Sequence, residues 1–229
     1  MANLKSLAKD TAIYGLSSII GRFLNYLLVP LYTHVIASSS GAYGVVTNLY
    51  AYTALLLVIL IYGMETTFFR FANKEGENPD KVYSTILTSV LTTSVLFVGI
   101  VVLFISPISS ALGYADHPSY VWAMAATVAI DAFQCIPFSY LRYKKRPLKF
   151  AALKLLFIGL NIFLNIAYFV ILPKLGANPF GIYDSGFDVG YVFYINLFCT
   201  ATITLFFWKE LRGFKFGFDG KLLKRMLGY

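Results

Sequence analysis

Seven polar or charged residues interrupt long apolar stretches, where such residues are costly and usually functional. A buried cation can neutralise an anionic group through charge-assisted hydrogen bonds, and polar stripes on several helices indicate a shared wet cavity. The set therefore predicts a shared, water-filled cavity. Its members are Arg22 and Asn25 in the first stretch, Asp131 and Gln134 in the fourth, and Lys154, Asn161 and Asn165 in the fifth.

Arg22 is the most deeply placed cation of the set. It lies ten residues after Ala12, where the first apolar stretch begins, or about 15 Å along a helix that rises about 1.5 Å per residue. Tyr14, Ser18, Arg22 and Asn25 follow the spacing of one helical face. Arg22 is either a structural cation neutralised by a neighbouring helix or part of a cationic wall that faces the substrate.

Asp131 needs a partner because an unpaired carboxylate at membrane depth would become protonated. Arg22 and Lys154 are the candidate partners, although Lys154 could also extend its ammonium group to the membrane surface. Asn161 and Asn165 have a second interpretation too, as interhelical hydrogen-bonding residues that only hold helices together.

Glu65 and Arg70 follow the second apolar stretch. They are candidates for a coupling or gating pair at the mouth of the predicted cavity. An interfacial pair with no functional role explains them equally well.

The elements that must position these residues are transmembrane helices. The chain has 229 residues, of which 58% are apolar and 13% are charged, whereas soluble domains carry about 25% charged residues. A membrane-spanning helix needs about 20 mostly apolar residues. Six stretches qualify and predict an all-α membrane protein with a six-helix bundle: residues 12–36, 43–64, 82–105, 121–140, 150–172 and 189–208.

The basic residues predict how this bundle is oriented. Of the 19 Lys and Arg residues, 16 fall in connectors on one side, Lys174 alone falls on the other, and Arg22 and Lys154 lie within helices. Cytoplasmic loops collect Lys and Arg, so both termini are expected in the cytoplasm. Because the cations lie between apolar runs rather than on a soluble face, nucleic-acid binding is not expected.

The last segment, residues 209–229, is predicted to be a basic amphipathic region outside the six-helix lobe of residues 1–208. Asp219 is a candidate helix cap. Leu222 and Met226 lie on one helical face, and Lys221 and Lys224 lie on another. This pattern is typical of a helix at the cytoplasmic interface, and we expect the native chain to continue beyond it.

The sequence gives no sign of a metal, cofactor or catalytic site. Its two histidines, His34 and His117, are not placed as in histidine-type lipid phosphatases, and Cys135 and Cys199 lie singly in apolar runs. Both cysteines are predicted to be small buried hydrophobic residues. These residues therefore argue against the membrane-embedded enzymes that such patterns would indicate.

Four segments resemble the polysaccharide-unit flippases of the O-antigen type, which belong to the multidrug/oligosaccharidyl-lipid/polysaccharide exporter superfamily. The resemblance covers nearly the whole chain, in the same order as in the N-terminal half of that family. The segments are KDTAIYGLSSIIGRFLNYLLVPLYTHVI, GAYGVVTNLYAYTALLLVILIYGMETTFFRFA, IPFSYLRYKKRPLKFAALKLLFIGLNIFLN and GFDGKLLKRMLGY.

The resemblance implies one six-helix lobe of a 12–14-helix fold, with a second lobe C-terminal to this chain. It also implies an inner-membrane protein that flips a polyprenyl-diphosphate-linked oligosaccharide by alternating access for cell-surface polysaccharide (lipopolysaccharide) biosynthesis. Arg22 would meet the diphosphate, and the amide side chains of Asn25, Gln134, Asn161 and Asn165 would meet sugar hydroxyls. Asp131 or Glu65 would bind a coupling proton or sodium ion.

Two alternatives remain open at the level of sequence. A drug or cation antiporter of the same superfamily would favour a cavity with more acid than base, which Arg22 argues against. A membrane-embedded enzyme acting on lipid-linked sugars would want an acidic pair in an outer loop, for which Asp184 and Asp188 are weak candidates.

Overall fold

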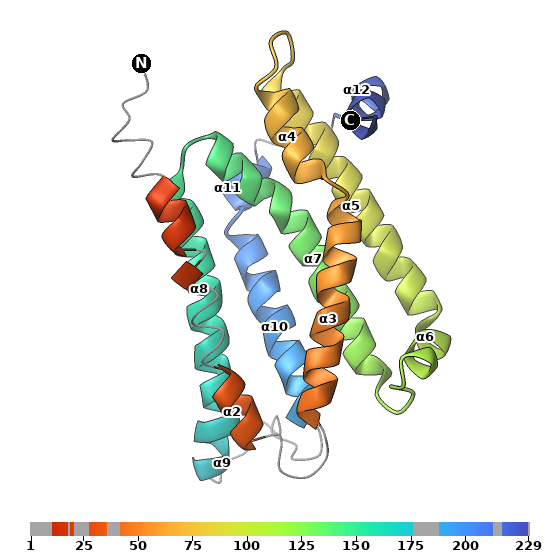
Figure 1. The fold of residues 1–229 in the computed structure, drawn as a ribbon, viewed down its shortest axis with the longest axis vertical. Helices are drawn as coiled ribbons and strands as arrows, with labels where there is room; N and C mark the ends of the chain where they lie inside the picture. Colours follow the sequence, from red (N-terminus) through yellow and green to blue (C-terminus); the bar gives the residue numbers. More distant parts are fainter. Residues whose placement is uncertain are drawn as a thin grey trace. The chain divides into compact units, whose positions relative to one another are not determined.

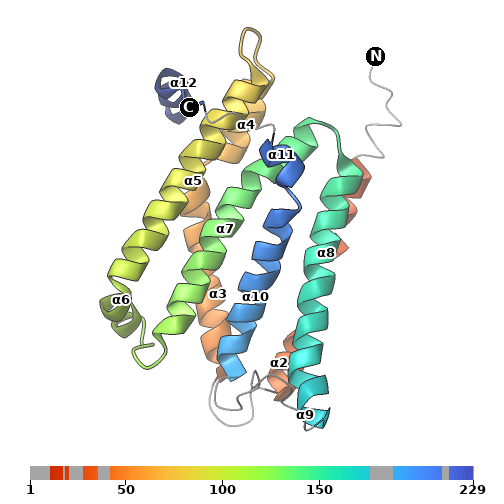
Figure 2. The same ribbon diagram turned by 180° about the vertical axis from the view of Figure 1, so that it is seen from behind.

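The computed structural model describes residues 11–17, 19–20, 28–35, 42–175, 188–212 and 217–228, and these residues form helices with no β-strand among them. Figures 1 and 2 show these helices as ribbons coloured along the sequence. The expectation of an all-α protein is therefore confirmed for this part of the chain. Arg22 and Asn25 lie outside it.

The chain divides into two compact units. Unit 1 comprises Met1–Ala51 and Pro147–Ile203, and unit 2 comprises Tyr52–Arg146 and Thr204–Tyr229. Two helices pass from one unit into the other: α3 (Ala42–Ile61) and α10 (Asp188–Leu205).

Unit 2 is built around α5 and α7, which lie side by side in both views (Figures 1 and 2). The short helices α11 and α12 belong to the C-terminal part of this unit. The bounds of its helices after α3 are α4 Met64–Ala72, α5 Pro79–Leu103, α6 Ile105–Ala111, α7 Pro118–Tyr143, α11 Trp208–Arg212 and α12 Gly220–Leu227.

Unit 1 contains α2 (Leu28–Val35) and α8 (Pro147–Ile166), together with most of α10. Helix α8 continues into a π-helical turn, Ala167–Ile171, and then into α9 (Leu172–Leu175). Pro173 lies in α9 and has no N–H to donate, so a regular helix would lose a hydrogen bond at this point. The π-helical turn closes at the residue before this proline, where the Leu172 N–H donates to the Ala167 carbonyl.

Within the part of the chain that the structure describes, four helical segments are long and apolar enough to cross a membrane. They overlap four of the six stretches that the sequence predicts to span the membrane, and the segment Val189–Leu205 is apolar but shorter. The predicted first span, residues 12–36, is described only in pieces, so six spans remain a prediction. The four segments are Tyr43–Ala72, Pro79–Leu103, Pro118–Tyr143 and Pro147–Lys174.

Large apolar side chains are exposed along the middle of these segments. Val58 and Ile59 of α3 and Val95 and Leu96 of α5 all lie on the outside of the protein. Contiguous apolar surface of this kind is rare on water-soluble monomers, whereas a bilayer accommodates it. The exposed faces therefore indicate a membrane protein.

Local sequence signals fix several helix ends. The Asn78 side chain accepts hydrogen bonds from the backbone N–H groups of Asp80 (2.9 Å) and Lys81 (3.3 Å) at the start of α5, where Pro79 occupies the first turn. This is a favourable N-terminal arrangement. Asp219 accepts from the Leu222 N–H at 3.0 Å, which confirms the predicted cap of α12.

The second predicted helix extends further than expected. The sequence predicted its end at Met64, but after a break at Tyr62 and Gly63 the chain forms α4, which is amphipathic and buries Phe68 and Phe71. Hydropathy falls in this segment because one of its faces is polar, while the other still packs on protein. Phe68 is fully buried, with Tyr83 and Tyr143 among its aromatic neighbours.

Candidate functional site

An ionic cluster lies where α4 begins. Glu65 is in the first turn of α4, where a helix end favours negative charge. Arg142, near the end of α7, donates from Nη2 to Glu65 Oε1 and, at 3.2 Å, to Ser139 Oγ. The Cys135 thiol donates to Glu65 Oε2 at 3.1 Å. One carboxylate thus joins α4 to two turns of α7.

The cluster is partly accessible to solvent. The side chains of Arg142 and Glu65 are 34% and 36% exposed, and the Arg142 guanidinium lies 5.2 Å from the centre of the Phe69 ring. An ion pair that is neither buried nor fully hydrated can exchange one partner for another charged group at moderate cost. This arrangement suits a contact that opens and closes.

The backbone is unusual beside this cluster. Tyr62 and Gly63 both have positive φ, at 34° and 74°, between the end of α3 and the start of α4. Tyr62 is the costlier of the two, because a residue with a Cβ rarely adopts this conformation. Its hydroxyl makes a 2.7 Å hydrogen bond with Ser89 Oγ on α5, which helps to hold the break.

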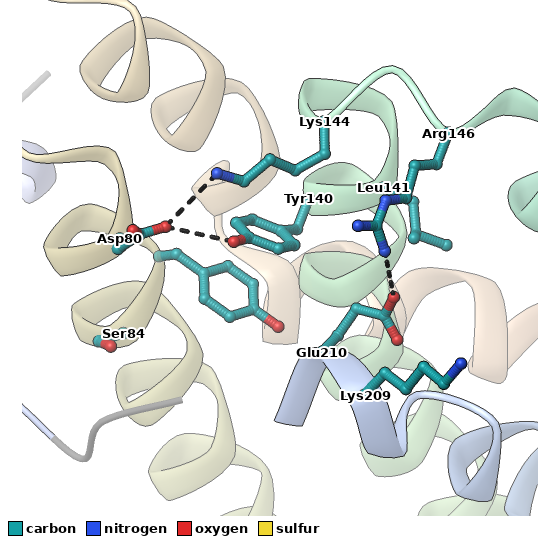
Figure 3. A pocket seen from close by; sticks show the side chains of 9 residues that line it. Asp80, Ser84, Tyr140, Leu141, Lys144, Arg146, Lys209 and Glu210 are labelled. Carbon is teal, nitrogen blue, oxygen red and sulfur yellow. Dashed lines mark hydrogen bonds and ion pairs between the residues drawn. The ribbon is translucent and has the colours of Figure 1, made fainter. Parts of the chain in front are cut away.

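A pocket of about 150 Å³ opens near the N-terminal end of α5 (Figure 3). Figure 3 shows Asp80 approached by Lys144 and Tyr140 from one side, and Glu210 approached by Arg146 from the other. The Lys144 and Arg146 nitrogens lie 3.7 Å and 3.6 Å from these carboxylates, and the Tyr140 hydroxyl donates to Asp80 at 3.2 Å. The pocket thus combines aromatic, anionic and cationic walls.

Charges in the pocket are not equally accessible. The Glu210 side chain is only 2% exposed, whereas those of Lys144 and Arg146 are 40% and 59% exposed. Burial lowers the pKa of the Lys144 ammonium, but the Tyr140 hydroxyl and the Asp80 carboxylate outweigh burial and raise this pKa above its ordinary value. Lys144 therefore stays charged throughout the physiological pH range.

Unit 1 holds a different kind of polar site. The Tyr32 hydroxyl donates to Asn165 Oδ1 at 2.8 Å, and Asn165 Nδ2 donates to the Asn161 carbonyl at 2.8 Å and to Asn161 Oδ1 at 3.1 Å. All three side chains are buried. The observed contacts are those of interhelical packing, the second of the two roles considered for these asparagines. Substrate binding by them remains a prediction.

The remaining predicted site residues are placed as follows. Gln134 is buried on α7 and donates from Nε2 to Thr204 Oγ1 at 2.8 Å. Asp131 is half-buried in unit 2 and Lys154 is half-buried in unit 1. The predicted partnership of Asp131 with Arg22 or Lys154 stays a prediction, since Arg22 lies outside the described residues.

The Glu65 pairing differs from the one considered from sequence. The ion pair that the structure records for Glu65 is with Arg142 rather than Arg70. Residues 65 and 142 are 77 positions apart, so no local spacing signals their contact. Cys135 also has a polar role that its apolar surroundings concealed, and Glu210 was not singled out because it lies in a short charged segment.

Among the described residues, no group of three or more His, Cys, Asp or Glu side chains is placed to hold a metal ion. Comparison with protein-family models, with curated proteins and with solved structures finds no match to this chain.

Proposed function

We propose that this protein takes part in moving a polyprenyl-diphosphate-linked oligosaccharide across the cytoplasmic membrane, as one lobe of a flippase with both ends of the lobe in the cytoplasm. The single observation that carries the proposal is the break at Tyr62 and Gly63 beside the Glu65–Arg142 pair. Interrupted membrane helices next to charged groups are typical of transporter substrate and ion sites.

The break gives α4 a place to pivot relative to α3. In this proposal the Glu65–Arg142 pair holds α4 against α7 in one state and separates in another. Arg142 is then available to a phosphate, whose oxygens suit the planar guanidinium fork. Glu65 is available to a coupling proton or sodium ion. No step makes or breaks a covalent bond, so the protein is proposed to be a transporter rather than an enzyme.

The break supports transport more strongly than catalysis. An enzyme gains from a rigid, preorganised constellation, whereas the half-exposed pair and the adjoining left-handed backbone suit a movable contact. A drug or cation antiporter of the same superfamily would use the same hinge. The flippase and the antiporter therefore differ only in their substrate.

Deletion of the gene in its own host tests the proposal. We expect loss of a cell-surface polysaccharide, with complete lipid-linked oligosaccharide accumulating in the inner leaflet, and recovery with a plasmid-borne copy. Incomplete lipid-linked sugar would instead indicate the enzyme. Unchanged polysaccharide with increased sensitivity to cationic drugs would indicate the antiporter, and either result would overturn the flippase proposal.

A further inference from the structure

The inner face of α12 is fixed to unit 2. Leu222 and Met226 are each 1% exposed and join the core formed by α4, α5 and α7. Arg225 approaches Glu77 with nitrogen–oxygen distances of 2.6 Å and 3.5 Å. Lys81 Nζ lies 2.7 Å from Asp219 Oδ2. The apolar face of α12 is therefore covered by protein and is not the face that could meet lipid.

Two acids beside α12 are held in ion pairs, Asp219 with Lys81 and Glu77 with Arg225. The Lys81 ammonium and then the Leu222 N–H lower the pKa of Asp219 to about 2, so this carboxylate stays ionised at neutral pH and neutralises Lys81. Glu77 neutralises Arg225. Within the described part of the chain, no ion pair is formed by the other two cations of the helix, Lys221 and Lys224.

The outer face of α12 combines these lysines with exposed apolar side chains. Lys221 and Lys224 are three positions apart, and Leu227 follows after three more, so the three side chains occupy adjacent positions on the helix surface. Leu227 is 57% exposed, and Phe218, just before the helix, is 58% exposed. Lysines flanking exposed apolar groups are typical of helices that lie in a membrane interface.

The position of α12 along unit 2 suits that environment. It packs beside α5 near the end of that helix where the membrane-length segment Pro79–Leu103 begins (Figure 1). The boundary of an apolar span lies at the level of the lipid headgroups. The outer face of α12 is therefore expected at headgroup level, at the end of the molecule that the distribution of basic residues assigns to the cytoplasm.

We propose that the outer face of α12, formed by Phe218, Lys221, Lys224 and Leu227, binds anionic phospholipid headgroups and so ties the α4–α5 end of unit 2 to the membrane surface. The two lysines, which have no acidic partner among the described residues, are complementary in charge to a leaflet that carries negative lipid. The proposal does not depend on the substrate, so it can fail while the flippase proposal stands, and the reverse is equally possible.

The test uses the whole chain in lipid nanodiscs of phosphatidylcholine with increasing phosphatidylglycerol. An environment-sensitive fluorophore is attached at Gly228→Cys, in a Cys135→Ser, Cys199→Ser background. We expect the emission to shift to the blue as phosphatidylglycerol rises. A surface lysine contributes about fivefold in affinity. Lys224→Gln should therefore weaken the apparent affinity for phosphatidylglycerol about fivefold, and Lys221→Gln with Lys224→Gln should weaken it about 25-fold.

Two matched variants complete the design. Replacing both lysines by arginine should preserve the response. Lys74→Gln, which alters an exposed lysine beside the Phe71 ring in the α4–α5 connector, should leave it unchanged. The proposal is overturned if the fluorophore stays in water at every lipid composition, if it is equally shielded in pure phosphatidylcholine, or if the double glutamine variant responds as the parent does. Shielding independent of lipid charge would show that Phe218 and Leu227 insert into the bilayer without a contribution from the lysines.

Discussion

The polar side chains described in units 1 and 2 stabilise the protein in different ways. In unit 1, Tyr32, Asn161 and Asn165 form a buried network of neutral hydrogen bonds. In unit 2, acids and bases pair at the basic end of the helices, and most of these pairs remain partly exposed. Neutral buried networks favour one packing arrangement, whereas exposed ion pairs exchange partners readily. The difference suggests that the neutral network of unit 1 is static, whereas the ion pairs of unit 2 can separate and exchange partners.

The largest expected effect concerns the core beneath the ionic end of unit 2. Phe68→Ala removes a fully buried ring that packs edge to face with Tyr83 and Tyr143. Such a truncation costs about 3–5 kcal/mol. Thermal unfolding in detergent should show a much lower midpoint, and hydrogen exchange should increase first in α4, α5 and α7. Equal increases in α8 and α10 would contradict the separation into units.

A smaller effect is expected in the neutral network of unit 1. Asn165→Leu removes the acceptor of the Tyr32 hydroxyl at a site where Asn165 is fully buried, and should cost about 1 kcal/mol, typical of membrane hydrogen bonds. Tyr32→Phe combined with Asn165→Leu should cost less than the two single changes added together. A double-mutant cycle of unfolding midpoints measures this coupling, and strict additivity would show that the two side chains act independently.

The helices that carry these residues were predicted from the sequence with unequal accuracy. The spans of α5 and α7 were predicted within about three residues because their apolar runs end at Pro, Asn and charged residues, which are strong local signals. The cap by Asp219 was predicted for the same reason. By contrast, α4 was missed because its polar face lowered its hydropathy, although its other face buries Phe68.

The candidate site was only partly predictable. Glu65 was singled out because a carboxylate beside a membrane span is conspicuous, but its partner Arg142 lies on another helix 77 residues away. Long-range pairing depends on how helices pack, and a single sequence does not encode that packing in any local spacing. The pocket around Tyr140 and Glu210 likewise draws on three separate helical segments. Asn161 and Asn165 were singled out as residues that bind substrate or join helices, but their hydrogen-bond partner Tyr32 was not.

The smallest expected effect is the response of α12 to pH. The pKa of Asp219 is lowered to about 2, below its ordinary value of about 3.9. The stabilisation from its ionised form is therefore fully present above about pH 4 and is lost as the pH falls toward 2. Hydrogen exchange of α12 should be constant between pH 5 and 8 after correction for intrinsic rates. Asp219→Asn should increase exchange at neutral pH, and loss of protection in the parent protein between pH 5 and 8 would contradict this assignment.

The most direct test of the account compares transport with protein level in membrane vesicles. Glu65→Gln and Arg142→Gln each remove one member of the unit 2 pair, and Tyr32→Phe, which removes the hydroxyl that donates to Asn165, serves as the matched change in unit 1. Translocation of a labelled lipid-linked oligosaccharide should fall at least tenfold in the first two variants at equal protein level, an effect of about 1.4 kcal/mol or more. In Tyr32→Phe, translocation should fall only in proportion to the protein present. If all three variants lose translocation only in proportion to protein level, the Glu65–Arg142 pair is structural and the account is wrong.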